Sequence, residues 1–172
     1  DPKCPICQRA KMTRAQHRIK KHSKPDDIPK PKKFGDQLTA DHIVLNEHDK
    51  SREEDQNVLV VKDRYTSWIS GYPTKTKNID ETKMKLRRFM GPEQEPGSIY
   101  SDNSGEIHKA CEELKWPQDT ATLYRSQTNG VAERANRTVR EGASCQLVQS
   151  WFHEDWWHWA VLTFCFLRNV SI

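Results

Sequence analysis

Short apolar runs alternate with amphipathic segments along residues 34–172. Runs of four to eight β-branched and aromatic residues predict strands, and apolar positions at helical spacing predict helices. The alternation of the two signals indicates an α/β or α+β layer fold. The expected strands are residues 37–45, 57–61, 65–72, 97–101 and 120–124, with a turn at 62–64, and the expected helices are 78–90, 107–114 and 156–168.

A further helix is expected after Asn129-Gly130, because both residues tolerate a positive φ and suit a turn. At about 100° per residue, the segment that follows has one apolar and one polar side. A single Glu on a polar helix face is ordinarily just solvated. The apolar side holds Val131, Ala135, Val139 and Gly142, and the polar side holds Glu133, Arg137 and Arg140.

Composition and charge divide the chain into two regions. Its 172 residues, 34% of them hydrophobic, suffice for one domain with a modest core plus an appendage. Residues 1–35 hold 11 Lys/Arg against 3 Asp, a net charge of +8, which leaves −4 for residues 36–172. No run approaches the roughly 18 apolar residues that span a bilayer. The odd number of cysteines, five, favours a reducing compartment, and the start at Asp1 suggests a piece of a longer protein.

The N-terminal region opens with a Cys-x-x-Cys pair, Cys4 and Cys7, whose thiolates can share one zinc ion. His17 and His22 complete a C-x2-C-x9-H-x4-H pattern, but that spacing is shorter than in a standard zinc finger. Further ligands upstream of Asp1 are a second interpretation, and a pair that binds no metal is a third. The sequence therefore predicts a partial zinc site and leaves its other ligands open.

Residues 17–33 are rich in lysine and proline, which predicts an extended linker. Phosphate is the natural partner of such a segment, although a merely solvated charged linker is an equal alternative. The lysines concerned are Lys20, Lys21, Lys32 and Lys33.

Three carboxylates are candidates for chemistry. Asp41 stands within an apolar run, where an ionised carboxylate is costly unless it is paired, hydrogen-bonded or metal-bound. Asp102 directly follows an expected strand, although Asp-Asn-Ser-Gly alone is typical of a turn. If these acids converge with Glu133, each raises the pKa of the others, and divalent cations are the usual means of keeping them ionised. Oxygen ligands favour Mg²⁺ or Mn²⁺ over zinc.

The sequence motifs around these three acids resemble those of one protein family. TADH at Asp41, SDNSGE at Asp102 and SQTNGVAERANRT at Glu133 are similar to the Asp, Asp, Glu motif of integrases from retroviruses and LTR retrotransposons. The NGVAERANRT wording is closest to copia-like elements. CPICQRAK, beginning at Cys4, resembles the tail of the His-His-Cys-Cys zinc module that precedes such cores.

This resemblance implies a ribonuclease-H-like α/β fold, with a five-stranded mixed sheet and helices on both faces. It implies three segments: residues 1–16 as the remnant of a zinc module, 17–33 as a basic linker and 34–172 as the catalytic core. It further implies 3′-end processing and strand transfer of retroelement DNA into target DNA in the nucleus, by a homo-multimer. Asp41, Asp102 and Glu133 would bind two Mg²⁺ ions about 4 Å apart.

The resemblance also suggests residues that contact DNA. Arginines one and two turns beyond Glu133 and the linker lysines suit backbone phosphates, and two polar residues before the helix suit the DNA end or only shape the turn. These residues are Arg137, Arg140, Lys20, Lys21, Lys32, Lys33, Gln127 and Asn129.

Some features depart from the family pattern. Only 30 residues separate Asp102 from Glu133, fewer than is usual in retroviral members. Asp36 competes with Asp41 as the first acid, and Glu106 competes with Glu133 as the third. A non-catalytic nucleic-acid-binding relic and a ribonuclease-H-like nuclease that never joins strands are the alternative functions.

Overall fold

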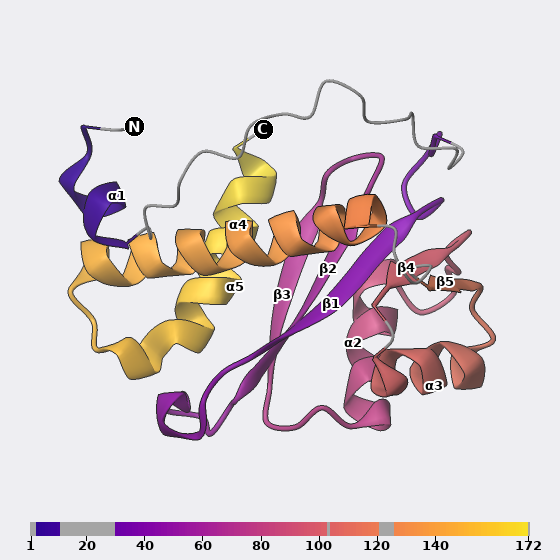
Figure 1. Cartoon of the computed structure of the whole chain (residues 1–172), viewed down its shortest axis with the longest axis horizontal. Helices are drawn as coiled ribbons and strands as arrows, with labels where there is room; N and C mark the ends of the chain where they lie inside the picture. Colours follow the sequence, from indigo (N-terminus) through magenta and orange to yellow (C-terminus); the bar gives the residue numbers. More distant parts are fainter. Residues whose placement is uncertain (1–2, 11–29, 103, 121–125, 172) are drawn as a thin grey trace.

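The computed structural model describes residues 3–10, 30–102, 104–120 and 126–171. Its centre is a five-stranded sheet in the order β3-β2-β1-β4-β5 (Figure 1). β1 pairs antiparallel with β2 and parallel with β4, so the sheet is mixed as predicted. The strands are β1 (Leu38–Val44), β2 (Asn57–Asp63), β3 (Ile69–Thr74), β4 (Ile99–Ser101) and β5 (Gln118–Thr120).

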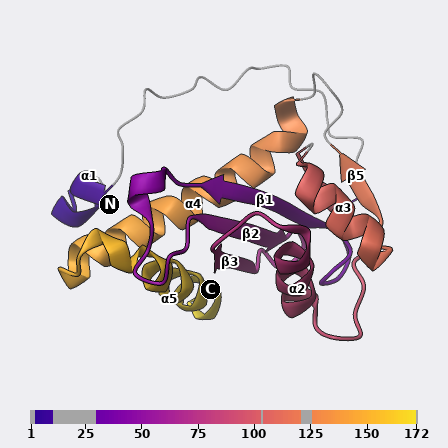
Figure 2. The ribbon, with the colours of Figure 1, turned by 90° about the horizontal axis from the view of Figure 1, so that it is seen from below.

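Helices cover both faces of this sheet, with α2 and α3 on one side and α4 and α5 on the other (Figure 2). The N-terminal helix α1 contacts α4. In the described part of the chain, no helix is long and apolar enough to cross a membrane. The helices are α1 (Pro5–Ala10), α2 (Ile79–Met90), α3 (Gly105–Leu114), α4 (Ser126–Ser150) and α5 (Trp157–Val170), with short 3₁₀ turns η1 (Glu47–Asp49) and η2 (Glu154–Trp156).

Strand β2 is buried on both faces and joins two hydrophobic cores. Leu59 and Val61 pack in the core beneath α2 and α3, whereas Val58 and Val60 pack in the core beneath α4 and α5. Alternate side chains of a strand point to opposite faces, so an uninterrupted apolar run is what this position requires. The predicted α/β fold class and five-stranded mixed sheet are thus confirmed. The fifth strand was expected at residues 120–124, of which 121–124 lie outside the described residues, and β5 precedes them at Gln118–Thr120.

The start of the third strand was predicted wrongly. Lys62 and Asp63 continue β2, and β3 begins at Ile69 instead of at residue 65. The turn is displaced because the buried Asp63 carboxylate accepts hydrogen bonds from both the backbone N–H and the hydroxyl of Thr66, each at 2.6 Å. This local capping supplies the turn that the Lys-Asp-Arg sequence was expected to form.

The predicted turn at Asn129-Gly130 is also wrong, since α4 begins at Ser126 and includes both residues. A helix gains one hydrogen bond for each residue added once it is nucleated, and strong helix formers follow Gly130. Gln127 consequently lies in a helix and not in a preceding loop. The predicted faces are otherwise close to those observed, because Ala135 and Val139 are buried and Glu133 is exposed.

The close approach of α5 to β3 depends on Gly71. A Cβ at Gly71 would lie 2.6 Å from Cγ1 of Val161, a buried and β-branched side chain with little room to move. We predict that Gly71→Ala lowers the free energy of unfolding by about 1–3 kcal/mol, as overpacking does. Urea unfolding followed by circular dichroism measures this change. Gly105→Ala is the matched control, since a Cβ at Gly105 would meet nothing within 4 Å; equal losses in the two variants would contradict the packing argument.

Candidate active site

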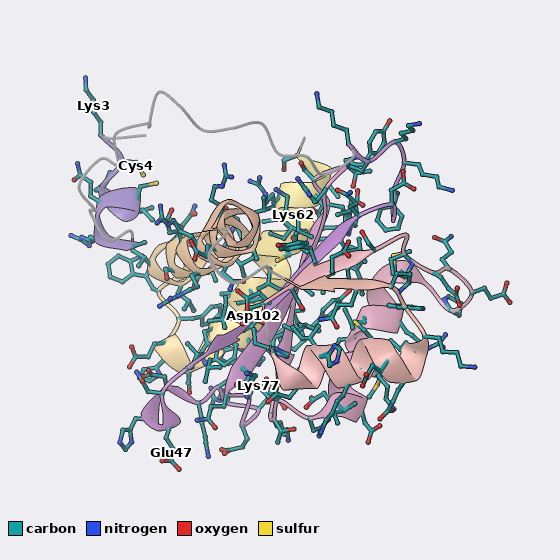
Figure 3. All side chains as sticks on the ribbon, turned by 45° about the vertical axis from the view of Figure 1, so that its right-hand side comes forward. Lys3, Cys4, Glu47, Lys62, Lys77 and Asp102 are labelled. Atoms are coloured by element: carbon teal, nitrogen blue, oxygen red, sulfur yellow. The ribbon has the colours of Figure 1, made fainter. Side chains whose placement is uncertain are left out.

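Asp41 and Asp102 lie side by side at the point where β4 ends against the middle of its parallel neighbour β1. The register of β1 and β4 pairs Ala40 with Ser101, and each acid is the next residue in its chain. Figure 3 shows Asp102 at the end of β4, beside β1. Asp102 thus lies at the carboxyl end of a strand, where open α/β sheets assemble their sites, and Asp41 lies beside it within β1. The structure therefore brings together two of the three predicted catalytic acids.

The Asp41 carboxylate is held from both sides. Oδ1 accepts the backbone N–H of His42, and Oδ2 accepts Nδ2 of Asn136 on α4, both at 2.8 Å. Burial, followed by the negative charge of Asp102, raises the pKa of Asp41 to about 6. The raised pKa is the expected signature of two like charges that share a partly dry site.

The loop after β4 shapes the surroundings of Asp102. Oδ1 of Asp102 accepts the backbone N–H of Ser104 at 3.1 Å, and Oγ of Ser101 donates to the Asp102 carbonyl oxygen at 2.9 Å. Gln118 of β5 donates to the same Ser101 hydroxyl at 2.6 Å. The backbone around Asp102 is thus fixed by neutral hydrogen bonds, and Asp102 remains half-buried next to Asp41.

Glu133 lies outside the Asp41–Asp102 pair. It is exposed on α4, one turn before Asn136, and lines a cavity of about 350 Å³ with Asn136, Arg137 and Arg140. Across the described ranges, no three His, Cys, Asp or Glu side chains form a group that could hold a metal ion. Glu133 is therefore linked to the aspartate pair through Asn136 on the same helix, but it does not form a cluster with the two aspartates.

The two competing acids have different surroundings. Asp36 accepts the backbone N–H groups of Lys32 and Lys33, which lowers its pKa, so it caps a turn before β1. Glu106, in the first turn of α3, accepts a hydrogen bond from Ser104 at 2.8 Å and lies 3.9 Å from Nζ of Lys77. Glu106 therefore contacts the same loop as Asp102. Asp36 instead binds backbone N–H groups and stabilises a turn.

Asn136 is a site residue that the sequence patterns did not reveal. Its amide nitrogen binds Asp41 while its Oδ1 is buried without a hydrogen-bond partner among the described residues. A buried acceptor without a partner is costly, which marks a place for a water or a cation. Its spacing of three residues from Glu133 was the available signal, since this places both on neighbouring positions of a helix face.

The donor set suits a hard divalent cation. The oxygen atoms at this site are the carboxylates of Asp41 and Asp102. Mg²⁺ and Mn²⁺ prefer oxygen ligands, and a cation between the two aspartates would offset their mutual repulsion.

The N-terminal cysteines lie at the start of α1, which packs on α4. Hydrogen bonds from Cys7 lower the pKa of Cys4, and both thiols are free. The alternative ligands His17 and His22 lie outside the described residues, as do Lys20 and Lys21.

The remaining predicted DNA-contact residues fall on α4 and at the end of the linker. Arg137 and Arg140 are exposed on the predicted polar side of α4, and Lys32 and Lys33 are exposed before β1. The backbones of Gln127 and Asn129 lie in α4, but their side chains are outside the described part of the structure.

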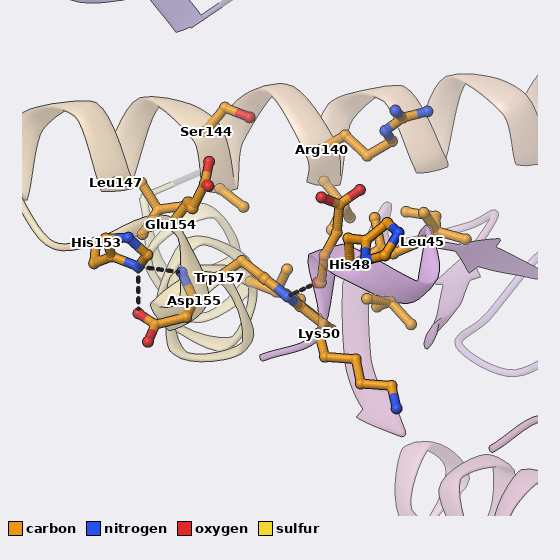
Figure 4. A pocket seen from close by; sticks show the side chains of 16 residues that line it. Leu45, His48, Lys50, Arg140, Ser144, Leu147, His153, Glu154, Asp155 and Trp157 are labelled. Atoms are coloured by element: carbon orange, nitrogen blue, oxygen red, sulfur yellow. Dashed lines mark hydrogen bonds and ion pairs between the residues drawn. The ribbon is translucent and has the colours of Figure 1, made fainter. Parts of the chain in front are cut away.

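A second cavity, of about 300 Å³, lies between α4, β1 and the start of α5 (Figure 4). Arg140 lines both this cavity and the one beside Glu133. Its floor is apolar, with Ile43 and Val139 among its lining residues, and its rim is polar. Nε1 of Trp157 donates to the carbonyl oxygen of Asp49 at 2.9 Å, which ties α5 to the loop after β1. This cavity is separate from the aspartate pair.

Comparison with known proteins identifies the fold. No family model matches the sequence. The structure is similar to the crystal structure of the catalytic core domain of BIV integrase, with a TM-score of 0.53 and 16% sequence identity over 80% of this chain and 82% of that chain. The chain has the ribonuclease-H-like fold of an integrase core. At this identity, the likeness establishes the fold alone.

The raised pKa of Asp41 predicts a pH-dependent stability in metal-free buffer. The folded state binds this proton more tightly than the unfolded chain, so the stabilisation is complete below about pH 4 and is lost as the pH rises through about 6. Asp41→Asn should abolish this dependence and be more stable than the parent at pH 7 by on the order of 1 kcal/mol, a figure reduced for the partial exposure of Asp41. Urea unfolding across pH 4–7 measures it, with the exposed Asp119→Asn as control. Parallel pH profiles for the parent and Asp41→Asn would contradict the assignment.

Proposed function

We propose that this chain is a Mg²⁺-dependent polynucleotidyl transferase that carries out DNA integration. The observation that supports it most is the close approach of Asp41, within β1, to Asp102, directly after β4, in an integrase-core fold. In 3′-end processing, water displaces an oxygen at a phosphodiester of the element's DNA end. In strand transfer, the freed 3′-hydroxyl displaces an oxygen of target DNA. Both are in-line displacements at phosphorus, so no covalent enzyme intermediate is required.

Asp41 and Asp102 would hold the divalent ions, with Glu133 as the third carboxylate. Bound there, Mg²⁺ would supply charge neutralisation at the reacting phosphate. Asn136 is a positioning residue, because its amide fixes the rotamer of Asp41 through a 2.8 Å hydrogen bond. Glu133 precedes Asn136 by three residues on α4, so the helix that orients Asp41 also carries the third acid.

The wider proposal is based on the resemblance of the sequence motifs to those of integrases. The element is of the LTR-retrotransposon class, with copia-like wording around Glu133. Its DNA ends and target DNA are bound by Arg137, Arg140 and the linker lysines, and by Gln127 and Asn129. The chain acts as a homo-multimer in the nucleus, because joining two DNA ends requires two positioned sites. Cys4 and Cys7 contribute to a zinc site.

A non-catalytic DNA-binding relic is the second candidate. One observation favours it: within the described residues, Glu133 does not join Asp41 and Asp102 in a group of three potential metal ligands. A nuclease that cuts without joining would use the same acids, and only a strand-transfer product separates it from an integrase.

The central prediction concerns Asp102→Asn. Replacing this carboxylate removes a proposed metal ligand but keeps the side-chain shape. We therefore expect Mg²⁺-dependent cleavage and joining of a duplex that mimics the element's end to fall by on the order of a hundredfold or more. Gel analysis of labelled duplex products measures both reactions, and an unchanged circular dichroism spectrum is the folding control. Parental activity in Asp102→Asn would rule out the proposed site.

A matched pair of variants identifies the third carboxylate. Glu133→Gln should reduce cleavage about as strongly as Asp102→Asn, whereas Glu106→Gln should retain most activity, because Glu106 already interacts with Ser104 and Lys77. Initial rates measured at saturating duplex and a range of Mg²⁺ concentrations distinguish the two. The reverse order of losses would assign the third ligand to Glu106 on α3.

A further inference from the structure

Four cations from separate segments converge beside the candidate active site. Lys62 lies on β2, Arg64 directly follows that strand, Arg134 lies on α4 and Arg168 lies near the end of α5. Burial, and then the positive charges of Arg168, Arg134 and Arg64, lower the pKa of Lys62, so all three arginines lie within electrostatic range of its ammonium group. None of the four was among the DNA-contact residues predicted from the sequence. We call these four residues the Lys62 cluster.

Neutral contacts hold the members of this cluster in place. Nη1 of Arg64 donates to Oε1 of Gln37 at 3.1 Å, and Nε of Arg134 donates to the carbonyl oxygen of Gly130 at 2.9 Å. Beside Arg168, the Asn169 side chain bonds to both the N–H and the carbonyl of Ile69, the residue of β3 that pairs with Lys62. The end of α5 is thereby fixed against the strand that neighbours Lys62.

No carboxylate neutralises the Lys62 cluster within the described ranges. None of its four side chains forms an ion pair there, and the adjacent Asp63 carboxylate is occupied by Gly35 and Thr66. Nε of Arg168 is buried without a hydrogen-bond partner among these residues. Converging like charges repel one another, and an unsatisfied buried donor is costly. Both costs are relieved by an anion that accepts hydrogen bonds.

The sheet register places this cluster next to the aspartate pair. Lys62 lies opposite Thr39, and Val60 lies opposite Asp41, so Lys62 and Asp41 are diagonal neighbours on the face that α4 covers. Diagonal positions of this kind are about 7–8 Å apart at the backbone. Arg134 directly follows Glu133 in α4. Figure 3 shows Lys62 near α4 on the same side of the molecule as Asp102.

The Lys62 cluster is distinct from the Arg137 and Arg140 pair. Around the axis of α4, Arg134 is separated by about 60° from Arg137 and by about 120° from Arg140 at 3.6 residues per turn. Arg140 lines both cavities, whereas Arg134 lines neither and lies within electrostatic range of Lys62. The Lys62 cluster and Arg140 therefore lie on different flanks of α4, with Arg137 between them.

We propose that Lys62, Arg64, Arg134 and Arg168 bind backbone phosphates of the DNA segment that flanks the reacting phosphodiester. The inference rests on the proposed function, and it assigns a phosphate-binding surface for that substrate. Lys62 and Arg168 are recessed, which suits a narrow sugar-phosphate backbone better than a flat lipid surface. Contacts of this kind fix the register of the duplex and carry little sequence information.

The test is DNA binding by the whole chain in an Asp102→Asn background, which separates binding from catalysis. Fluorescence anisotropy with a short blunt-ended duplex is measured at several salt concentrations. Lys62→Gln/Arg134→Gln should weaken binding by on the order of tenfold and reduce the slope of log K against log salt by about 2, since each phosphate contact contributes about 0.9. The matched control is Arg87→Gln/Lys109→Gln, an Arg and a Lys exposed on the α2 and α3 side, which should change neither quantity.

Several outcomes would overturn the inference. The first is an unchanged slope of log K against log salt in Lys62→Gln/Arg134→Gln. The second is a loss of DNA affinity equal to that of the control variant. The third is that Lys62→Gln/Arg134→Gln loses binding to phosphatidylserine vesicles but retains DNA binding. Because Arg134 is exposed, Arg134→Gln alone provides a variant with little effect on folding and should lower the slope by about 1. If the parent chain neither cleaves nor joins DNA but the cluster variants still lose binding, the proposed function fails and the phosphate-binding surface remains.

Discussion

The parallel pairing of β1 with β4 is the contact on which the rest of the site depends. It aligns Ala40 with Ser101 and so places Asp41, the next residue of β1, beside Asp102, the residue that follows β4. Two half-buried carboxylates repel each other. Burial, and then this repulsion, raise the pKa of Asp41 to about 6. A fold retains such a pair only if something else stabilises it, and divalent cations are the ordinary agent.

Packing in the two hydrophobic cores offsets the free-energy cost of this aspartate pair. β2 is buried on both faces, and its neighbour β1 receives α4 on one side and the α2–α3 layer on the other. The same helix that covers β1 donates the Asn136 amide to Asp41 and presents Glu133 one turn earlier. Packing of α4 therefore determines the geometry of the aspartate pair, and a shift of this helix would change both the orientation of Asp41 and the approach of Glu133.

Positive charge is distributed around the carboxylates on two flanks of α4. Arg137 and Arg140 line the cavity beside Glu133, and the Lys62 cluster occupies the other flank. Cations on both flanks would lower the electrostatic cost of bringing a DNA phosphate to an acidic site. The arrangement thus joins an acidic centre to basic surroundings, as chemistry on a polyanion requires.

Local patterns in the sequence predicted most of the elements, and contacts between distant residues account for the site features that they missed. The apolar run of β2 and the amphipathic spacing of α2 were sufficient for those elements, and the Asp41 position was informative because a carboxylate in an apolar strand is costly. The contact of Asn136 with Asp41 spans 95 residues, so the spacing of Asn136 from Glu133 could mark its place on the helix face but not its partner. The Lys62 cluster likewise exists only after three-dimensional convergence. The start of β3 was misplaced because the capping role of Asp63 depends on its burial.

The most direct test of metal binding by the aspartate pair is the anomalous X-ray scattering of Mn²⁺ in crystals of this chain. We expect a Mn²⁺ peak between the carboxylates of Asp41 and Asp102 that disappears in Asp102→Asn. Ordered aspartates with no peak between them at saturating Mn²⁺, or a peak that persists unchanged in Asp102→Asn, would contradict the proposed metal site.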